Sequence, residues 1–167
     1  RYPGGSEGFA SDLALLEEAL SEGGNSWAAR AFVRPALYRA RTFGFHLAAL
    51  DTRENSAVHE RVIADLLAQA RVTFHYQELS EEERCELLVR ELHSSRPLTG
   101  RNSELREESR QVLGFLEAMS DAIRRYGRES VGSYVVSMTE GVSDILEVLV
   151  MAREAGLPTA EKKDSTG

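Results

Sequence analysis

The chain has 167 residues, a formal net charge of −7 and a hydrophobic content of 42 %. These values suit one ordinary globular domain, and the acidic balance without a basic run argues against nucleic acid as a partner. No apolar run approaches the roughly 20 residues of a membrane span. The single cysteine, Cys85, excludes an intrachain disulfide and fits the reducing cytoplasm.

The N-terminal part of the sequence predicts helices joined by glycine. Apolar residues at helical spacing predict a first helix over 10–22, which Ser11 can cap and Gly23 ends. A second helix is predicted from Ser26, and Pro35 inside it predicts a kink or two short helices. Two interpretations remain open for its four arginines, a phosphate site or a solvated face that pairs with the acidic first helix: Arg30, Arg34, Arg39 and Arg41.

The most informative stretch is FGFHLAALDTRENSAVH, residues 43–59. Its apolar part predicts a strand over 45–51, followed by a polar turn and a helix over 56–71 that Ser56 caps. Ligands of α/β sheets bind at the carboxyl ends of strands, and Arg53 stands in this turn. An arginine fork suits bidentate binding of phosphate or carboxylate. A local ion pair with Asp51 is the alternative interpretation.

The C-terminal part predicts three more helices and a second strand. Ser80 and Glu83 form a capping-box sequence ahead of a helix over 81–92. A long helix is predicted over 103–126 and a β-branched strand over 133–138. A last helix is predicted over 143–155, with Ser143 as its cap and five apolar residues buried: Ile145, Leu146, Leu149, Val150 and Ala152.

The predicted organisation is one segment over 1–157 and a flexible tail over 158–167. The fold class is mostly α with two β–α units. Two strands alone do not make a stable sheet. Either the missing strands belong to another part of a larger protein, or these two strands are weaker than they look.

The residues alone give little catalytic chemistry. The four histidines are scattered without metal-ligand spacing, and Cys85 lies in a charged helix where a structural thiol is the ordinary interpretation. Glu140 and Asp144 lie four residues apart near the end of the second strand. They could hold Mg²⁺ or stabilise the helix dipole.

Two stretches resemble motifs of the phosphoenolpyruvate carboxylase family. FGFHLAALDTRENSAVH is similar to FG-x-x-L-x-x-LDIRQ-x-S-x-x-H, and SYVVSMTEGVSDILEVLVMAREAGL is similar to YVISM-x-x-x-x-SD-x-L-x-V-x-x-L-x-x-EAG. Between them, LSEEERCELLVRELHSSRPL resembles the family's linking segment. The three matches keep the family's order and spacing and cover residues 13–157.

The resemblance implies a lyase that carboxylates phosphoenolpyruvate with bicarbonate, giving oxaloacetate and phosphate with the help of Mg²⁺ or Mn²⁺. This carbon dioxide fixation is anaplerotic and feeds the tricarboxylic acid cycle. The implied fold is an α/β (TIM-type) barrel with many extra helices, assembled as a cytoplasmic homotetramer. The two predicted strands would then be barrel strands.

The resemblance also carries roles onto three residues. Arg53 matches the arginine of LDIRQ, which in the family lies at the active site by the phosphate and bicarbonate, so it is the expected catalytic and substrate-binding residue. Asp51 is expected to orient it. Glu91 and Arg96 fall where the family has a glutamate and an arginine implicated in subunit contacts.

The sequence departs from the family in two ways. Thr52 replaces isoleucine and Glu54 replaces glutamine, and the added charge of Glu54 should weaken phosphate binding unless it is paired or points away. The family's catalytic histidine, metal-binding glutamate and aspartate, and GRGGS loop do not occur here. We therefore expect an internal segment that binds no metal and is inactive alone. The alternative is a non-catalytic helical interaction module derived from the family.

Overall fold

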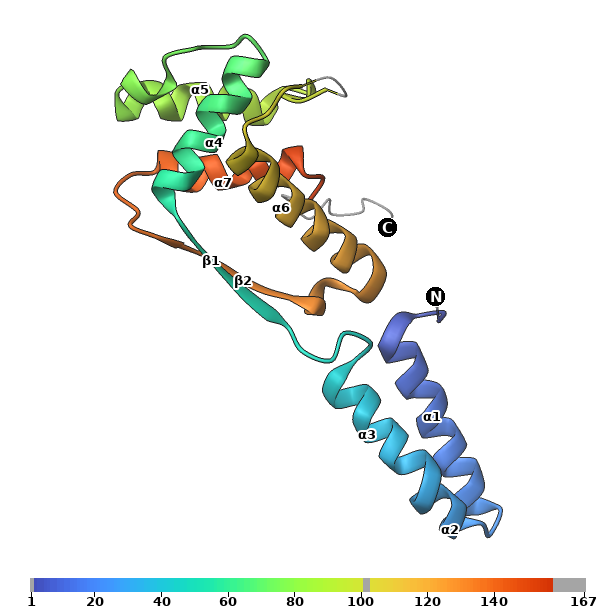
Figure 1. Cartoon of the computed structure of the whole chain (residues 1–167). Helices are drawn as coiled ribbons and strands as arrows, with labels where there is room; N and C mark the ends of the chain where they lie inside the picture. Colours follow the sequence, from blue (N-terminus) through green and yellow to red (C-terminus); the bar gives the residue numbers. More distant parts are fainter. Residues whose placement is uncertain (1, 101–102, 158–167) are drawn as a thin grey trace. The chain divides into compact units, whose positions relative to one another are not determined.

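The computed structural model describes residues 2–100 and 103–157 (Figure 1). The described chain is mostly helical and contains two β–α units, as predicted, and its two strands pair in one small sheet. The expected tail over 158–167 lies outside the described residues. The elements in chain order are α1 Gly5–Glu22, α2 Ser26–Ala28, a π-helical turn Ala29–Val33, α3 Arg34–Phe43, β1 Leu50–Asn55, α4 Ser56–Gln69, a 3₁₀ turn Tyr76–Glu78, α5 Glu81–His93, α6 Glu107–Tyr126, a 3₁₀ turn Arg128–Ser130, β2 Val131–Ser137 and α7 Ser143–Glu154.

The described chain forms two compact units, each with its own core. The first unit comprises the residues up to 50 together with 122–132, and the second comprises 51–121 and the residues from 133 onward. In the described part of the chain, no helix is both long and apolar enough to cross a bilayer.

The first unit is built on a helical hairpin in which α1 packs against α3 (Figure 1). Its small core contains Ala10, Leu37 and Ala40. Arg34 pairs with Glu17 of α1 at 2.5 Å, so this arginine serves as a partner for the acidic first helix. Helix α1 begins at Gly5, five residues before the predicted start at residue 10, and Gly4 precedes it in the left-handed conformation (φ 71°) that glycine allows.

Pro35 interrupts the second helical segment, as predicted. The backbone widens into a π-helical turn over Ala29–Val33, and α3 then begins with Pro35 in its first turn. Proline is favourable at that position because the first amides of a helix need no partner within the helix. The wider turn is a recognised way to interrupt an α-helix.

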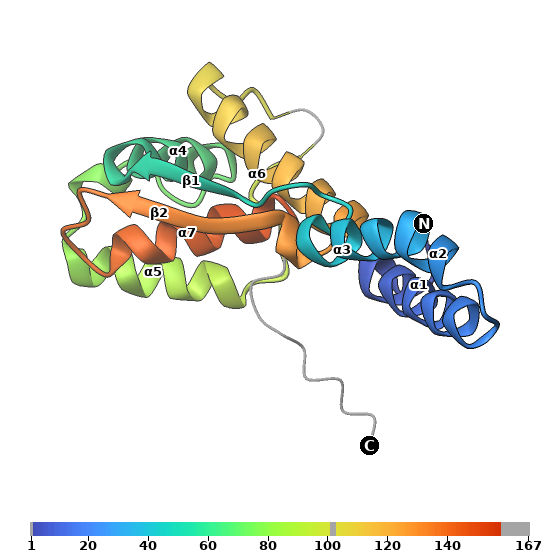
Figure 2. The same ribbon diagram turned by 90° about the horizontal axis from the view of Figure 1, so that it is seen from below.

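The second unit has a core shared by four helices, α4, α5, α6 and α7. Figure 2 shows the two strands lying side by side. Tyr134 of β2 packs against the helical core, so one face of the strand pair rests on helices. The strands are parallel, because residues 51 and 54 bond to residues 133 and 137 in the same order. The buried residues of the core are Val62, Ile63, Leu66, Leu67, Tyr76, Leu87, Leu88, Leu98, Leu113, Leu116, Val150, Met151 and Ala155.

The first strand is displaced from its predicted position. We predicted 45–51, but β1 covers Leu50–Asn55, and the apolar run before it forms turns and bends. Gly44 and Leu47 have positive φ angles of 55° and 69°, which are incompatible with an extended chain. Phe45 instead packs near Phe9, with ring centroids 5.7 Å apart. The prediction was wrong because tertiary contacts, rather than local apolarity, place this strand.

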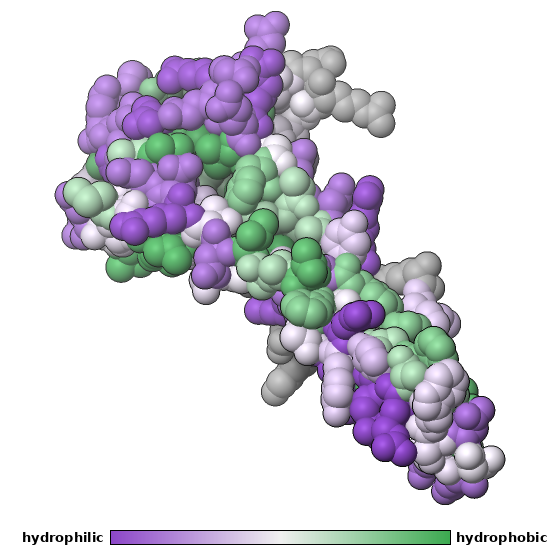
Figure 3. Space-filling view, turned by 60° about the horizontal axis from the view of Figure 1, so that its bottom comes forward, coloured by the Kyte–Doolittle hydropathy of each residue, from purple (hydrophilic) through white to green (hydrophobic). Residues whose placement is uncertain are grey.

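Exposed apolar side chains remain on both units, and Figure 3 shows hydrophobic residues reaching the surface in each of them. On α7, Ile145 is 47 % and Leu149 is 36 % exposed, although the helical pattern predicted both as buried. The described residues leave this face of α7 uncovered. The positions that do enter the core are Ser143, Glu147, Val150 and Met151.

The capping box of α5 is present as predicted. The Glu83 amide donates to Ser80 Oγ at 3.3 Å, and the Ser80 amide donates to the Glu83 carboxylate at 2.8 Å. We expect Ser80→Ala to lower the free energy of unfolding by about 1 kcal/mol, measured by urea denaturation. Ser11→Ala is the control, because Ser11 is exposed inside α1 and alanine should be neutral or slightly stabilising there. Equal destabilisation by both variants would contradict the capping role.

Candidate functional site

Arg53 lies within β1. The prediction that it lies in a turn after the strand was wrong. Thr52 and Glu54 are half-buried, whereas Asp51 and Arg53 are exposed, which is the alternation of a strand with one covered face. The side chain of Arg53 makes no hydrogen bond or ion pair with any described residue. The guanidinium is therefore available to an external anion.

Asp51 does not orient Arg53, which corrects our expectation. Its Oδ1 atom accepts a hydrogen bond from the backbone amide of Ser133 at 2.7 Å. This bond ties the beginning of β1 to β2. The alternative interpretation of Arg53, a local ion pair with Asp51, is also not observed.

Glu54 points away from Arg53, which answers the concern raised by its added charge. It lies on the half-buried face of β1, and its carboxylate accepts the Asn55 amide at 2.9 Å. Its charge acts on that side of the strand: burial and then Glu54 raise the pKa of Tyr134 to about 12. Because successive side chains of a strand point to opposite faces, a phosphate beside Arg53 would not face Glu54 directly.

The two strands are joined at their carboxyl ends by side chains. Ser56 Oγ donates to the Met138 carbonyl at 2.7 Å, and Ser137 Oγ donates to the Glu54 carbonyl at 3.0 Å. Ser56 is thus not the cap of α4. That role belongs to Asn55, whose side-chain oxygen accepts the Ala57 amide at 2.9 Å.

His59 lies beneath these strand ends and is fully buried. Its Nε2 atom and the Tyr134 hydroxyl are hydrogen-bonded at 2.9 Å, and its Nδ1 atom has no partner among the described residues. Burial lowers the pKa of His59, while the charges of Glu54 and Asp144 oppose that shift. His59 thus connects α4 to β2 as a neutral side chain at physiological pH.

A cavity of about 550 Å³ opens where both strands end and helices α4 and α7 begin. Four of its five charged lining side chains are already engaged: Glu60, Glu81, Arg84 and Asp144. Glu81 accepts the Ser143 amide at 2.9 Å and the Ser143 hydroxyl at 2.6 Å, so α7 is capped from α5 and not by Ser143 as predicted. Arg84 contacts Glu60 at 3.5 Å and lies over the Tyr76 ring, 5.3 Å from its centroid.

Glu140 and Asp144 do not form a metal site in this structure. The Asp144 carboxylate accepts the amides of Glu140 and Gly141, at 2.7 and 3.0 Å, and so stabilises the loop before α7. Among the described residues, no three His, Cys, Asp or Glu side chains lie close enough together to hold a metal ion. The residues present here do not fit the divalent cation that the family resemblance implies.

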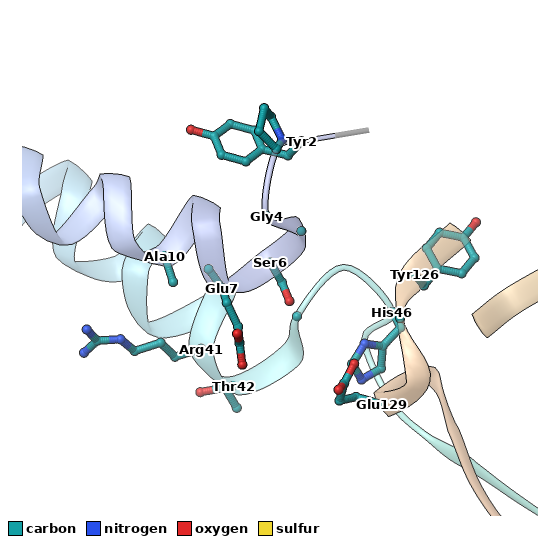
Figure 4. A pocket seen from close by; sticks show the side chains of 15 residues that line it. Tyr2, Gly4, Ser6, Glu7, Ala10, Arg41, Thr42, His46, Tyr126 and Glu129 are labelled. Atoms are coloured by element: carbon teal, nitrogen blue, oxygen red, sulfur yellow. The ribbon is translucent and has the colours of Figure 1, made fainter. Parts of the chain in front are cut away.

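The first unit contains a larger cavity, of about 930 Å³, shown in Figure 4. It lies between the start of α1, the end of α3 and the 3₁₀ turn after α6. His46 lies in it, and its buried Nδ1 atom has no partner among the described residues. The charged groups of its lining are one guanidinium, of Arg41, and two carboxylates, of Glu7 and Glu129.

Glu91 and Arg96 lie together within the chain. The Glu91 side chain is 6 % exposed and its carboxylate pairs with Arg96 Nη2 at 3.1 Å, while the Arg96 side chain is 46 % exposed. Arg153 from α7 donates to the carbonyls of Glu91 and Ser94, and Glu154 accepts the amides of Leu98 and Thr99, at 3.0 and 2.7 Å. The turn that carries Arg96 is therefore held from α7.

A buried hydrogen-bonded pair, Glu147 and Tyr76, was missed by the sequence analysis. Glu147 is fully buried in α7, and its Oε1 atom accepts the Tyr76 hydroxyl at 2.8 Å. Its Oε2 atom has no partner among the described residues. The only signal in the sequence was a carboxylate one turn after Ser143, on the same helical face. Cys85, in contrast, is an ordinary half-buried thiol, and burial raises its pKa.

Comparison with known proteins identifies the family. The phosphoenolpyruvate carboxylase family matches residues 4–166. The chain belongs to the phosphoenolpyruvate carboxylase family. The phosphoenolpyruvate carboxylase of Mycolicibacterium paratuberculosis is 48 % identical over 149 residues, and that of Rhodothermus marinus is 41 % identical over 162 residues.

These alignments cover 88 % and 96 % of this chain, but only 16 % and 17 % of the two relatives. The chain therefore spans about one sixth of the length of the curated phosphoenolpyruvate carboxylases it matches. Because the family match runs through nearly the whole chain, a helical interaction module derived from the family is not the favoured interpretation.

Proposed function

We propose that this chain is an internal segment of a phosphoenolpyruvate carboxylase and that Arg53 binds the anionic substrate there. The proposal is supported above all by the position, exposure and contacts of Arg53. It occupies the arginine position of the LDIRQ-like motif, it is exposed on β1, and it has no partner among the described residues. An arginine without a partner can bind two oxygens of a phosphate or a bicarbonate, because its planar guanidinium donates two parallel hydrogen bonds.

The proposed reaction begins when a bicarbonate oxygen attacks the phosphorus of phosphoenolpyruvate. The bond from phosphorus to the enol oxygen breaks, which gives carboxyphosphate and the pyruvate enolate. Carboxyphosphate then releases carbon dioxide and phosphate, and the enolate carbon attacks carbon dioxide to form oxaloacetate. Arg53 would hold the phosphoryl oxygens in place and balance their negative charge.

The barrel placement of the two strands is part of the proposal. It is supported by the exposed sheet face that carries Asp51, Arg53 and Val135, and by the exposed apolar residues Ile145 and Leu149 on α7. Surfaces of this kind are expected where a segment packs against further protein. The other strands of the α/β barrel would come from the remainder of the enzyme.

We propose that the complete enzyme is a cytoplasmic homotetramer in which Glu91 and Arg96 contribute to subunit contacts. The exposed Arg96 would reach the neighbouring subunit, and the buried Glu91 carboxylate would hold it in position. The ligands of the Mg²⁺ or Mn²⁺ ion would come from outside the described residues.

The proposal is tested by assaying the complete protein that carries this segment. We expect oxaloacetate formation that depends on both phosphoenolpyruvate and bicarbonate, followed through malate dehydrogenase and NADH oxidation. The isolated 167-residue chain should show no turnover above the blank. Turnover by the isolated chain, or an inactive complete protein that is folded, would contradict the proposal.

A further inference from the structure

The polar residues of the two family motifs fall into two groups in this structure. One group joins the motifs to each other. Besides the bond from the Ser133 amide to Asp51, it makes hydrogen bonds from Ser56 to the Met138 carbonyl, from Ser137 to the Glu54 carbonyl, and between His59 and Tyr134. The other group contains Arg53, which has no partner in the described residues. The motifs thus supply both the guanidinium of Arg53 and the hydrogen bonds that hold the strands around it.

The two serine bonds are reciprocal and close the carboxyl end of the strand pair. Each hydroxyl comes from one β–α unit and reaches a carbonyl of the other, with oxygen distances of 2.7 and 3.0 Å. They occur at the ends of the strands, where β1 leads at Asn55 directly into α4 and β2 ends at Ser137. These side-chain bonds hold the carboxyl ends of the two strands together.

The Ser137 bond lies next to Arg53 in the chain. Its acceptor is the carbonyl of Glu54, which belongs to the peptide unit between Glu54 and Asn55, so the bond fixes the backbone of β1 one residue after Arg53. Ser137 is only half-buried, and its hydroxyl bond contributes little hydrophobic packing. A local restraint on the backbone is therefore its main effect.

We propose that Ser137, together with Ser56, is a positioning residue that holds Arg53 for its anionic ligand. The inference rests on the proposed function of Arg53. A bidentate fork needs a fixed direction of approach, whereas a point charge tolerates displacement. Small displacements of a group that contacts the reacting atoms can change rates by up to about a hundredfold.

The experiment measures kcat and KM for phosphoenolpyruvate in the complete enzyme. Ser137→Ala should lower kcat/KM by about tenfold, within the range that small displacements produce, and Ser137→Thr should restore most of it because the hydroxyl is kept. Ser133→Ala is the matched control. Ser133 lies on the same strand and is exposed, and its hydroxyl makes no hydrogen bond with a described residue.

A second arm separates positioning from general structural damage. In an Arg53→Lys background, Ser137→Ala should have almost no further effect, because lysine does not use the fork geometry. An equal loss in both backgrounds, an unchanged kcat/KM for Ser137→Ala, or an equal loss for Ser133→Ala would overturn the inference. If Arg53→Ala itself left kcat/KM unchanged, the proposed function of Arg53 would fail instead.

Discussion

Replacing Arg53 with alanine in the complete enzyme is expected to lower kcat/KM for phosphoenolpyruvate by about a hundredfold or more, the size of effect seen when one preorganised charge-stabilising donor is removed. The reason is that the phosphoryl oxygens would lose the two hydrogen bonds that the Arg53 guanidinium donates. Folding should be unaffected, since Arg53 is exposed and has no partner in the described chain.

Two further variants make this test specific. Arg53→Lys keeps the charge and loses the fork, so its activity should fall between those of the parent enzyme and Arg53→Ala. Arg90→Ala is the matched control, because Arg90 is an exposed arginine on α5 with no side-chain partner among the described residues. Similar kcat/KM values for Arg53→Ala and Arg90→Ala would remove Arg53 from the substrate site.

The second large effect concerns stability and comes from Glu147. Burial raises the pKa of this carboxyl to about 7, the hydrogen bond from Tyr76 opposes the shift, and the nearby charges of Asp144 and Glu60 add to it. In the unfolded chain its pKa returns to about 4.3. Between these two values the folded protein holds a proton that the unfolded chain releases.

The sign of the pH dependence follows from this difference. The stabilising contribution of the protonated carboxyl is complete below about pH 4.3 and is lost as the pH rises to about 7, the folded pKa of Glu147. Over that window the loss is about 3 kcal/mol in the free energy of unfolding. Above it, the folded protein carries a buried carboxylate whose Oε2 atom has no partner among the described residues.

Glu147→Gln should remove this dependence, since glutamine stays neutral and can still accept the Tyr76 hydroxyl bond. We expect the variant to be about 3 kcal/mol more stable than the parent at pH 8 and nearly equal to it near pH 4.5. Urea denaturation at several pH values measures the difference. Glu86→Gln, an exposed position on α5, is the control. Parallel stability profiles for Glu147→Gln and the parent chain would contradict this account.

Local rules predicted the helices well and several helix caps poorly. The capping box of Ser80 was correct because both of its bonds are made within four residues of the chain. Ser56 and Ser143 also had suitable positions, but their hydroxyls bond to Met138 and Glu81, which are distant in sequence. A serine before a helix can satisfy its hydroxyl in either way, and only the neighbouring elements decide which bond forms.

The strand carrying Arg53 shows a similar limit. The motif resemblance identified the right segment, but apolarity placed the strand five residues too early, over 45–51 rather than Leu50–Asn55. The polar sequence of β1 can form a strand because β1 pairs with β2, and because one face of β1 stays exposed to solvent. That exposed face could not be read from a single sequence, since alternation alone does not say which side is covered.

The sequence by itself determined the mostly helical character, the two β–α units and, through its motifs, the family. It also singled out Arg53 as the candidate site residue, and that role stays a prediction. These features depend on local periodicity and on residue identity, which a sequence displays directly. The tertiary structure alone decided that Asp51 bonds to Ser133, that Glu54 faces away from Arg53 and that Glu147 is buried. Each of these depends on which distant element lies opposite a side chain, and that information arises only when the chain has folded.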